Sequence, residues 1–332
     1  MEEKNQLLEE NNEENENLSA IQTPGYLIMK RFFKNKLAVV GLGIIIAIMI
    51  FCIIGPIFSP YGEYEIFYKY TATGEEFRVQ DGQDISQSGV EMNLKAPISS
   101  KHFLGTDADG RDVFTRLMYG GRISLIFGFC VVLIELLIGV TLGSVAGYYG
   151  KKIDMLIMRL VDVFYCIPFL PLMLMISSVM AAMKVPAQQK IYVLMLIMGI
   201  LKWPSVARLV RGQILSIREM EYMQAAKAAG LRTSRIILKH LIPNVTSIII
   251  VMATMDLGSV ILTESTLSFL GVGLSFPYAS WGNMVNAVNN SVIMQNYLNI
   301  WLPPGIAILL LVMAFNFIGD GLRDAFDPKM KR

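Results

Sequence analysis

The sequence predicts an all-α integral membrane protein with six transmembrane helices. Of the 332 residues, 54% are hydrophobic and only 17% are charged, whereas soluble domains carry about 25% charged residues. The mean hydropathy is +0.50, and the apolar runs approach the about 20 residues that a helix needs to cross about 30 Å of hydrocarbon. A net charge of +2 is too small to indicate a nucleic-acid-binding protein.

The first three spans are expected in apolar runs at 37–58, 123–149 and 163–183. The first run is uncharged throughout, and its length matches the hydrocarbon thickness. The second run is interrupted only by Glu135. The third run contains Pro168 and Pro171, so we expect a bent helix, because a proline in a helix interior removes a backbone hydrogen bond.

The last three spans are expected at 191–206, 245–270 and 300–318. The fourth is long enough only if it continues past Leu201, with the stem of Lys202 on apolar surface and its ammonium group reaching water. The fifth carries two carboxylates, Asp256 and Glu264, and the sixth opens with two consecutive prolines.

Lysine and arginine are distributed unevenly among the connecting segments. They precede the first span, follow the sixth, and occur between spans two and three and above all between spans four and five. The 271–299 connection has none, and the 59–122 connection is long enough to cross the membrane regardless of its charge. Because basic loops stay in the cytoplasm, both termini are predicted to be cytoplasmic.

Five regions are predicted along the chain. The first sixteen residues hold seven glutamates, which predicts a disordered tail and differs from the basic start of a secretory signal. The regions are a disordered cytoplasmic tail at 1–25, an N-terminal segment with the first span at 26–58, an extracytoplasmic loop with an interfacial helix at 59–118, a transmembrane core at 119–321 that includes a cytoplasmic loop at 207–244, and a cytoplasmic tail at 322–332.

The extracytoplasmic loop contains two β-prone stretches and one helix-prone stretch. The β-prone stretches, at 64–70 and 76–80, are separated by a Thr-Gly pair, so a small β-hairpin is expected. Residues 112–119 are predicted to form an amphipathic helix at the membrane interface.

The remaining polar residues and the thiols do not indicate a metal site. The run GTDADGRD, which ends at Asp112, lacks the loop length and the closing glutamate of an EF-hand. Its Asp and Gly residues are expected to form turns that Arg111 or Asp112 pins. His102 and His240 are isolated, and the three cysteines lie in apolar segments at unrelated spacings, which indicates buried thiols.

A polar stretch interrupts the transmembrane core, with the sequence EYMQAAKAAGLRTSRIILKHLIPN at 221–244. Strong helix formers in its first half predict a helix, and Gly230 suits the left-handed residue that ends it. Thr233 or Ser234 can cap a second short helix, which Pro243 is expected to end. Such a shape can bind in a groove of a soluble partner; the alternative is a solvated basic loop that only sets the topology.

This stretch resembles the EAA loop of ABC-importer permeases, in which Glu-Ala-Ala is followed by a glycine and later by Leu-Pro or Ile-Pro. Gln224, Ala225, Ala226, Gly230 and Pro243 occupy those places, and the departure is Gln224 where the family usually has glutamate. Further motifs are similar to those of the dipeptide/oligopeptide/nickel permease group, in the same order: FKNKLA at 33–38, HFLGTDADGRDV at 102–113, ESTLSFLG at 264–271, SWGNM at 280–284 and AFNFIGDGLRD at 314–324. The chain after residue 25 is similar above all to the C-type permease subunit of an oligopeptide or dipeptide importer.

The resemblance implies the type I ABC importer permease fold and a multi-pass location in the bacterial inner membrane, without enzymatic activity. It also implies a second, B-type permease subunit, two ATP-binding subunits and an extracytoplasmic peptide-binding protein. Because the sequence has no GxxxxGK[ST] phosphate loop, ATP and Mg are expected in the ATPase subunits, and this chain is expected to hold no cofactor. The residues expected to contact the ATPase are Glu221, Gln224, Ala225, Ala226, Gly230, His240 and Pro243.

Three carboxylates inside the predicted spans are candidates for the translocation pathway or a gate, because ionisable residues in spans are functional candidates by default. Glu135 either lines the pathway or pairs with a neighbouring helix, and Asp256 faces the pathway or the partner subunit. Glu264 either holds an external gate or caps the turn that follows it. Asp162 is expected to form a structural ion pair with Arg159.

Three other functions compete with peptide import. A nickel importer of the same group differs little in its membrane subunits, although the chain has no His or Cys cluster. A secondary transporter can couple to protons through Glu135 or Asp256. An intramembrane protease needs paired catalytic residues at matched depth, and the sequence indicates none.

Overall fold

The computed structural model describes residues 24–80, 88–274 and 277–327. The acidic stretch up to residue 23 and the last five residues, which were predicted to be parts of cytoplasmic tails, lie outside the described residues. The start of the predicted C-terminal tail, at 322–326, belongs to the last helix.

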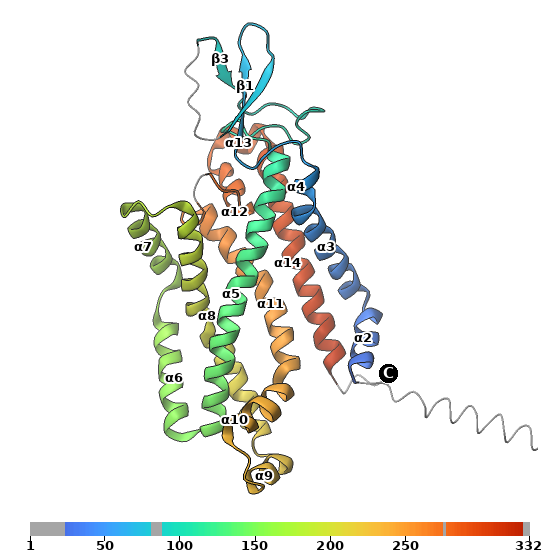
Figure 1. Ribbon diagram of the computed structural model, residues 1–332, viewed down its shortest axis with the longest axis vertical. Helices are drawn as coiled ribbons and strands as arrows, with labels where there is room; N and C mark the ends of the chain where they lie inside the picture. The colour runs from blue at the N-terminus through green and yellow to red at the C-terminus, as the bar shows by residue number, and fades with distance from the viewer. Residues whose placement is uncertain (1–23, 81–87, 275–276, 328–332) are drawn as a thin grey trace, which may run out of the picture.

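The described residues form an elongated helical bundle with a small sheet at one end (Figure 1). Five of the described helices are long and apolar enough to cross a membrane, and a bent pair of shorter helices makes a sixth span. The five are α3 (Lys36–Ile53), α5 (Val113–Tyr149), α8 (Ala187–Ile217), α11 (Ile242–Phe269) and α14 (Leu298–Phe326). Two short helices, α2 (Pro24–Lys34) and α4 (Gly55–Phe58), flank α3. The all-α, six-span prediction is confirmed.

The broken span consists of α6 (Lys151–Cys166) and α7 (Phe169–Ala182), which are bent by 73°. The break falls at Ile167 and Pro168, and Pro168 takes the N-cap position of α7. Pro171 was also predicted to bend this span, but it does not. It lies in the first turn of α7, where its missing N–H needs no partner. The α6 helix also begins well before the apolar run, since its first turns carry charged residues that a search for apolar runs excludes.

The second span is one continuous helix, α5, and no separate interfacial helix precedes it in the described chain. The prediction for 112–119 is therefore wrong. Asp112 is the N-cap of α5 and accepts a hydrogen bond from the Thr115 N–H at 2.7 Å. Thr115 and Met118 are buried, so the first turns of α5 are covered by protein and do not lie on a membrane surface.

The closest helix packing is between α5 and α8, and three glycines of α5 make it possible. Gly139, Gly143 and Gly147 are four residues apart, so they form one stripe along the helix. A Cβ atom at Gly143 would lie 2.6 Å from the Ala207 carbonyl oxygen, and one at Gly147 would lie 2.9 Å from the Ile214 Cβ. Small residues at this spacing let two membrane helices approach until their backbones nearly touch.

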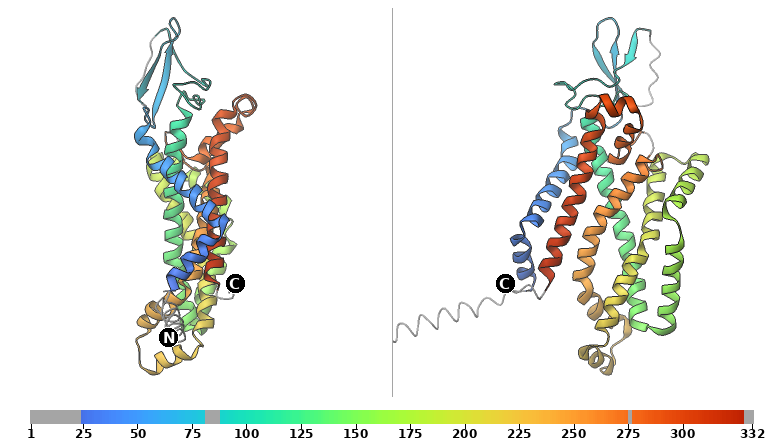
Figure 2. Two further views of the ribbon diagram at one scale, coloured as in Figure 1. Left: turned by 90° about the vertical axis from the view of Figure 1, so that its right-hand side faces the viewer. Right: turned by 180° about the vertical axis from the view of Figure 1, so that it is seen from behind.

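The bundle is broad and shallow. The helix α3 packs against α14, α14 against α11, α11 against α5, and α5 against α8 and α6. Seen from behind, α3 and α14 lie on one side and α6 with α7 on the other, and a quarter turn makes the bundle narrow (Figure 2). Many large apolar side chains on these helices are exposed, which suits a surface covered by lipid or by another subunit.

The sheet at one end is built from β1 (Glu65–Tyr70), β2 (Glu76–Gln80) and β3 (Val90–Met92), in the order β2-β1-β3. The antiparallel pair β1–β2, with Tyr68 opposite Phe77, confirms the predicted hairpin. The third strand was not predicted, because three residues are too few to give an alternating pattern. Short helices lie at the same end, namely α12 (Trp281–Val285), η2 (Asn286–Asn289) and α13 (Ser291–Asn296) (Figure 1).

The opposite end of the bundle carries α9 (Glu221–Ala228), α10 (Thr233–Ile236) and the π-helical turn η1 (Ile237–Leu241) (Figure 1). This segment was predicted to start at residue 207, but α8 continues to Ile217. The projecting segment is therefore defined by residues 218–241.

Candidate coupling and pathway sites

The projecting segment has the predicted helix–Gly–helix form. Gly230 follows α9 with φ +72°, a backbone conformation that glycine adopts without steric cost. On α9, Glu221, Gln224 and Ala225 are exposed and Ala226 is half-buried. The face that they form is open to a partner.

One buried methionine fixes α9 to the bundle. Met223 is fully buried and packs in an apolar cluster with Ile214 of α8, Ile236 of α10 and Leu241 of η1. The rest of α9 makes little contact with the core, so Met223 is the main buried contact between α9 and the bundle.

Replacing Met223 with alanine is expected to loosen α9 without unfolding the spans. Truncation of a buried methionine costs about 2–5 kcal/mol, and here the loss is confined to the attachment of one short helix. Backbone amides of α9 should exchange faster with deuterium, while amides of α5 keep their rates. The matched control is Tyr222→Ala, because Tyr222 is exposed; equal exchange rates in the two variants would contradict the role of Met223.

A second anchor joins the start of the projecting segment to the end of α5. The Arg218 guanidinium donates to the carbonyl oxygens of Gly147 at 3.0 Å and Tyr148 at 3.3 Å. A cation at a helix C-terminus also interacts favourably with the helix dipole. The Lys227 ammonium lies 5.5 Å from the centre of the Tyr148 ring, so both ends of α9 are tied to this corner.

Gln224 makes a local contact that the family's usual glutamate cannot make. Its side-chain amide donates to the Glu219 carbonyl oxygen at 3.2 Å, and a carboxylate has no N–H to donate. The side chain remains exposed. His240 is half-buried at the end of η1 and its carbonyl accepts a hydrogen bond from the Asn244 amide at 2.6 Å.

Two predictions about the second half of the segment are wrong. Pro243 does not end a helix, because it lies at the start of α11, and η1 runs into α11 without a break. Proline is tolerated there since the first turn of a helix needs no donor from its nitrogen. Neither Thr233 nor Ser234 caps α10; the N-cap is Arg232, without a side-chain hydrogen bond.

A second candidate site lies about halfway along the spans. Glu135 of α5 is 1% exposed, and its carboxyl group interacts with that of Asp256 on α11 and with the Lys202 ammonium on α8. Lys202 also donates to the Ser259 hydroxyl at 3.5 Å. Glu135 therefore interacts with groups on two neighbouring helices and also lines a cavity. The sequence analysis did not predict this cluster. The similar depth of all three ionisable residues within their predicted spans could have indicated it.

Two cavities meet at this cluster. One, of about 380 Å³, lies among α5, α6, α7, α8 and α11, and is lined by Glu135, Lys202 and Asp256 together with uncharged residues. The other, of about 880 Å³, runs along α8, α11 and α14 to Arg323, at the end of the bundle that carries α9. Both are lined by Ser205 and Asp256, so they adjoin at these two residues. We call the two adjoining cavities, which extend from the middle of the spans to that end, the groove.

Glu264 lies elsewhere, in a buried cluster of serines. Its carboxylate accepts hydrogen bonds from Ser124 of α5 at 3.1 Å and from Ser268 at 2.8 Å. Ser280, the N-cap of α12, lies 3.5 Å from Ser268. Glu264 is 2% exposed and does not line either arm of the groove. This geometry favours a structural role, holding α5, α11 and α12 together, over a gate.

The predicted ion pair of Asp162 forms with a different partner. Its carboxylate lies 3.0 Å from the Arg208 guanidinium of α8, whereas Arg159 on its own helix was expected. Arg208 also lies over the Tyr165 ring, 4.8 Å from its centre. The pair is half-exposed and joins α6 to α8.

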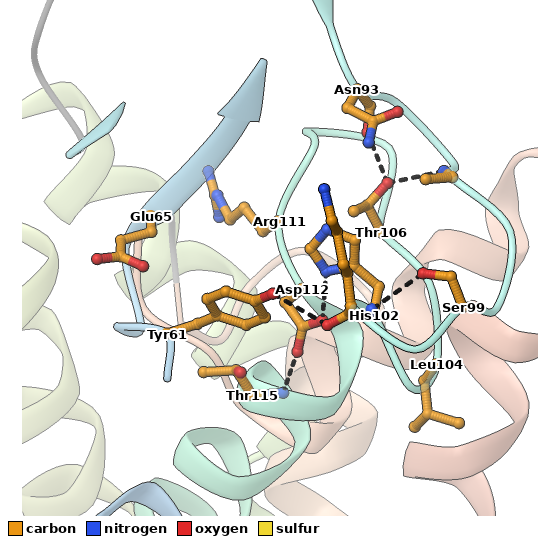
Figure 3. A network of polar contacts seen from close by, with 12 residues as sticks. Tyr61, Glu65, Asn93, Ser99, His102, Leu104, Thr106, Arg111, Asp112 and Thr115 are labelled. Carbon is orange, nitrogen blue, oxygen red and sulfur yellow. Dashed lines mark hydrogen bonds and ion pairs between the residues drawn. The ribbon is translucent and has the colours of Figure 1, made fainter. Parts of the chain in front are cut away.

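In the external loop, the turns at 105–112 are packed around a buried histidine (Figure 3). His102 is 2% exposed, and its two ring nitrogens lie 2.8 Å from Asp112 and 3.0 Å from Glu76. Ionised carboxylates only accept hydrogen bonds, so both ring nitrogens donate and the ring is positively charged. His102 therefore joins the sheet, through Glu76 of β2, to the N-cap of α5. Asp112 thus takes part in pinning the loop, as predicted.

Raising the pH is expected to weaken this junction. Burial opposes the charged ring, but the hydrogen bonds with Asp112 and Glu76 outweigh it and raise the pKa of His102 above 6.5. A raised folded-state pKa stabilises the fold fully below pH 6.5, and this stabilisation is lost as the pH rises through the folded-state pKa. Amides of β2, corrected for intrinsic exchange rates, should exchange faster at alkaline pH. In His102→Gln this pH dependence should disappear, and its persistence would contradict the assignment.

Comparison with known proteins adds independent findings. A family model described as "Binding-protein-dependent transport system inner membrane component" matches residues 139–332, and one described as the N-terminal TM domain of oligopeptide transport permease C matches residues 23–74. The dipeptide transport system permease protein of Bacillus subtilis (strain 168) is 39% identical over 326 residues, covering 97% of this chain and 92% of the relative. The oligopeptide transport system permease proteins of Bacillus subtilis (strain 168) and Haemophilus influenzae are 35% and 37% identical, covering 92% and 90% of this chain and 89% and 87% of the relatives.

Proposed function

Because this chain belongs to the family of binding-protein-dependent transport system inner membrane components, we propose that it is the C-type permease subunit of an ATP-driven oligopeptide or dipeptide importer. The proposal rests mainly on helix α9, which is anchored at one end of a multi-pass bundle and presents an exposed face to a partner. The peptide substrate is proposed from the relatives, which are dipeptide and oligopeptide permeases by name.

The projecting segment is proposed to be the contact with an ATPase subunit. Glu221, Gln224 and Ala225 are exposed on α9, and docking relies on the shape of this helix, since Gln224 carries no charge. Gly230 sets the angle between α9 and α10, and His240 and Pro243 lie on the return to α11. ATP and Mg bind to the partner ATPase subunits in this proposal.

The broad, shallow bundle is proposed to be half of the translocation pathway, with a B-type permease as the other half. The groove that joins Glu135 and Asp256 to the α9 end is its inward-facing part. An extracytoplasmic binding protein delivers peptide at the sheet end, and both termini are cytoplasmic. When the ATPase dimer closes, α9 is displaced, Met223 and Arg218 carry the movement to α5, α8 and α11, and the groove changes its access.

The test is uptake of radiolabelled dialanine and trialanine by the complete complex in proteoliposomes. Uptake should require ATP and the binding protein and should survive an uncoupler. Uptake that persists without ATP but collapses with an uncoupler would favour proton coupling through Glu135 or Asp256. Uptake of nickel without uptake of either peptide would favour the metal importer of the same group.

A further inference from the structure

The cluster of Glu135, Asp256 and Lys202 contains two carboxyl groups and one ammonium group. With both carboxylates ionised, two negative charges face one ammonium group, which leaves one unbalanced negative charge. The other residues that line the 380 Å³ cavity are uncharged. Two adjacent carboxylates in the middle of the spans cannot both stay ionised unless a further positive charge joins them, so without such a charge the two carboxyl groups share a proton.

The cluster is also incompletely hydrogen-bonded. Among the described residues, Oε1 of Glu135 and Oδ2 of Asp256 are buried and receive no hydrogen bond from a donor group of the protein. The hydrogen bond open to this pair is a proton shared between the two carboxyl groups. Glu135 is 1% exposed and lines the cavity, so its carboxyl group lies at the wall of the cavity. A buried acceptor without a partner is costly, and a bound donor would remove that cost.

We propose that Glu135 and Asp256 form a binding site for the ammonium group of the transported substrate, in the middle of the membrane. An ammonium group supplies one positive charge and three N–H donors, so it can take the place of the shared proton and donate to both oxygens. The cavity is within the size range of small-molecule sites, about 300–1,000 Å³, and it adjoins, at Ser205 and Asp256, the larger cavity that leads to the α9 end.

Lys202 has a different role in this site. Its ammonium group neutralises one carboxylate, so that the site binds a single additional charge. It also offers a positive group to a substrate carboxylate or peptide carbonyl that follows the amine into the groove. The chemistry thus selects molecules with a protonated amine near an acceptor group, such as a peptide with a free amino terminus. This inference rests on the proposed peptide transport.

The test measures binding inside the groove without the binding protein, whose own preferences would otherwise dominate. Ser205 lines both cavities, so Ser205→Cys in the reconstituted complex reports occupancy through protection from a thiol reagent. Cys166 is exposed, contrary to the prediction of buried thiols, so labelling is measured in a Cys166→Ser background. A chain that keeps Ser205 gives the background signal.

Three probes separate the chemistries. Trialanine should protect Cys at position 205 at a concentration about tenfold lower than N-acetyl-trialanine, as expected for loss of a charge-assisted contact. N-acetyl-Ala-Lys-Ala tests whether a side-chain ammonium can replace the amino terminus. Glu135→Gln should abolish the difference between trialanine and its acetylated form, whereas Asp162→Asn, which neutralises a half-exposed carboxylate on α6, should preserve it.

The outcomes distinguish this inference from the proposed function. Equal protection by trialanine and N-acetyl-trialanine, or no protection by either while the complex takes up trialanine, would overturn the ammonium site and leave peptide transport intact. If the wild-type complex takes up no peptide, the proposed function fails, and protection by methylammonium alone would still support an amine site. A Glu135→Gln chain that retains the tenfold preference would also overturn the assignment.

Discussion

Replacing Gly143 with valine is expected to cost about 3 kcal/mol of stability or more, in the range of severe overpacking. The added Cβ would lie 2.6 Å from the Ala207 carbonyl oxygen and 3.0 Å from the Ala207 Cα. These are backbone atoms of α8, which cannot rotate away as a side chain can. The two helices must therefore separate, and the purified complex should melt at a lower temperature or fail to accumulate in the membrane.

The matched control is Gly212→Ala, on the other helix of the same pair. A Cβ at Gly212 would meet no atom of the described residues within 4 Å, and alanine favours a helix over glycine by about 1 kcal/mol. This variant should be as stable as the wild type or more stable. If Gly143→Val melts at the wild-type temperature while Gly212→Ala also has no effect, the close approach of α5 and α8 is not important for stability.

The spans and turns could be predicted because their signals are local. Apolar runs of sufficient length predicted the long helices, Gly230 predicted the left-handed turn, and the β-prone stretches predicted the hairpin. The failures have local causes too. The start of α5 was misjudged because its charged and polar residues are covered by the external loop, and Pro243 was misjudged because proline at the start of a helix resembles proline after one.

The contents of the pathway site could not be predicted from spacing. Glu135, Lys202 and Asp256 lie on three different helices, and only the packing of α5 against α8 and α11 brings them together. For the same reason the Lys202 ammonium was expected to reach water, and no pair of ionisable residues at the same depth in the membrane was expected. His102 similarly meets Glu76 only because the sheet folds over the N-terminus of α5.

Replacing Gly230 with valine is expected to reduce peptide uptake by about tenfold while ATP hydrolysis continues. Gly230 has φ +72°, and the left-handed conformation costs an ordinary residue roughly 1–2 kcal/mol, with a further penalty for a β-branched side chain. No atom of the described part of this chain lies within 4 Å of the new Cβ position, so crowding within the chain contributes nothing. The turn should relax to another conformation, and α9 should change its angle to α10.

The comparison of Gly230→Val with Gly230→Asn isolates this backbone effect. Both variants add a side chain of similar size at an exposed position, but asparagine tolerates the left-handed conformation and valine does not. Uptake and ATP hydrolysis are measured in the same proteoliposomes with equal amounts of complex. Gly230→Asn should keep most of the coupling, whereas equal uptake by both variants would mean that the angle of α9 does not transmit the power stroke. Loss of hydrolysis in Gly230→Val alone would instead locate the defect in ATPase docking, because a displaced α9 would then fail to bind and not merely fail to transmit movement.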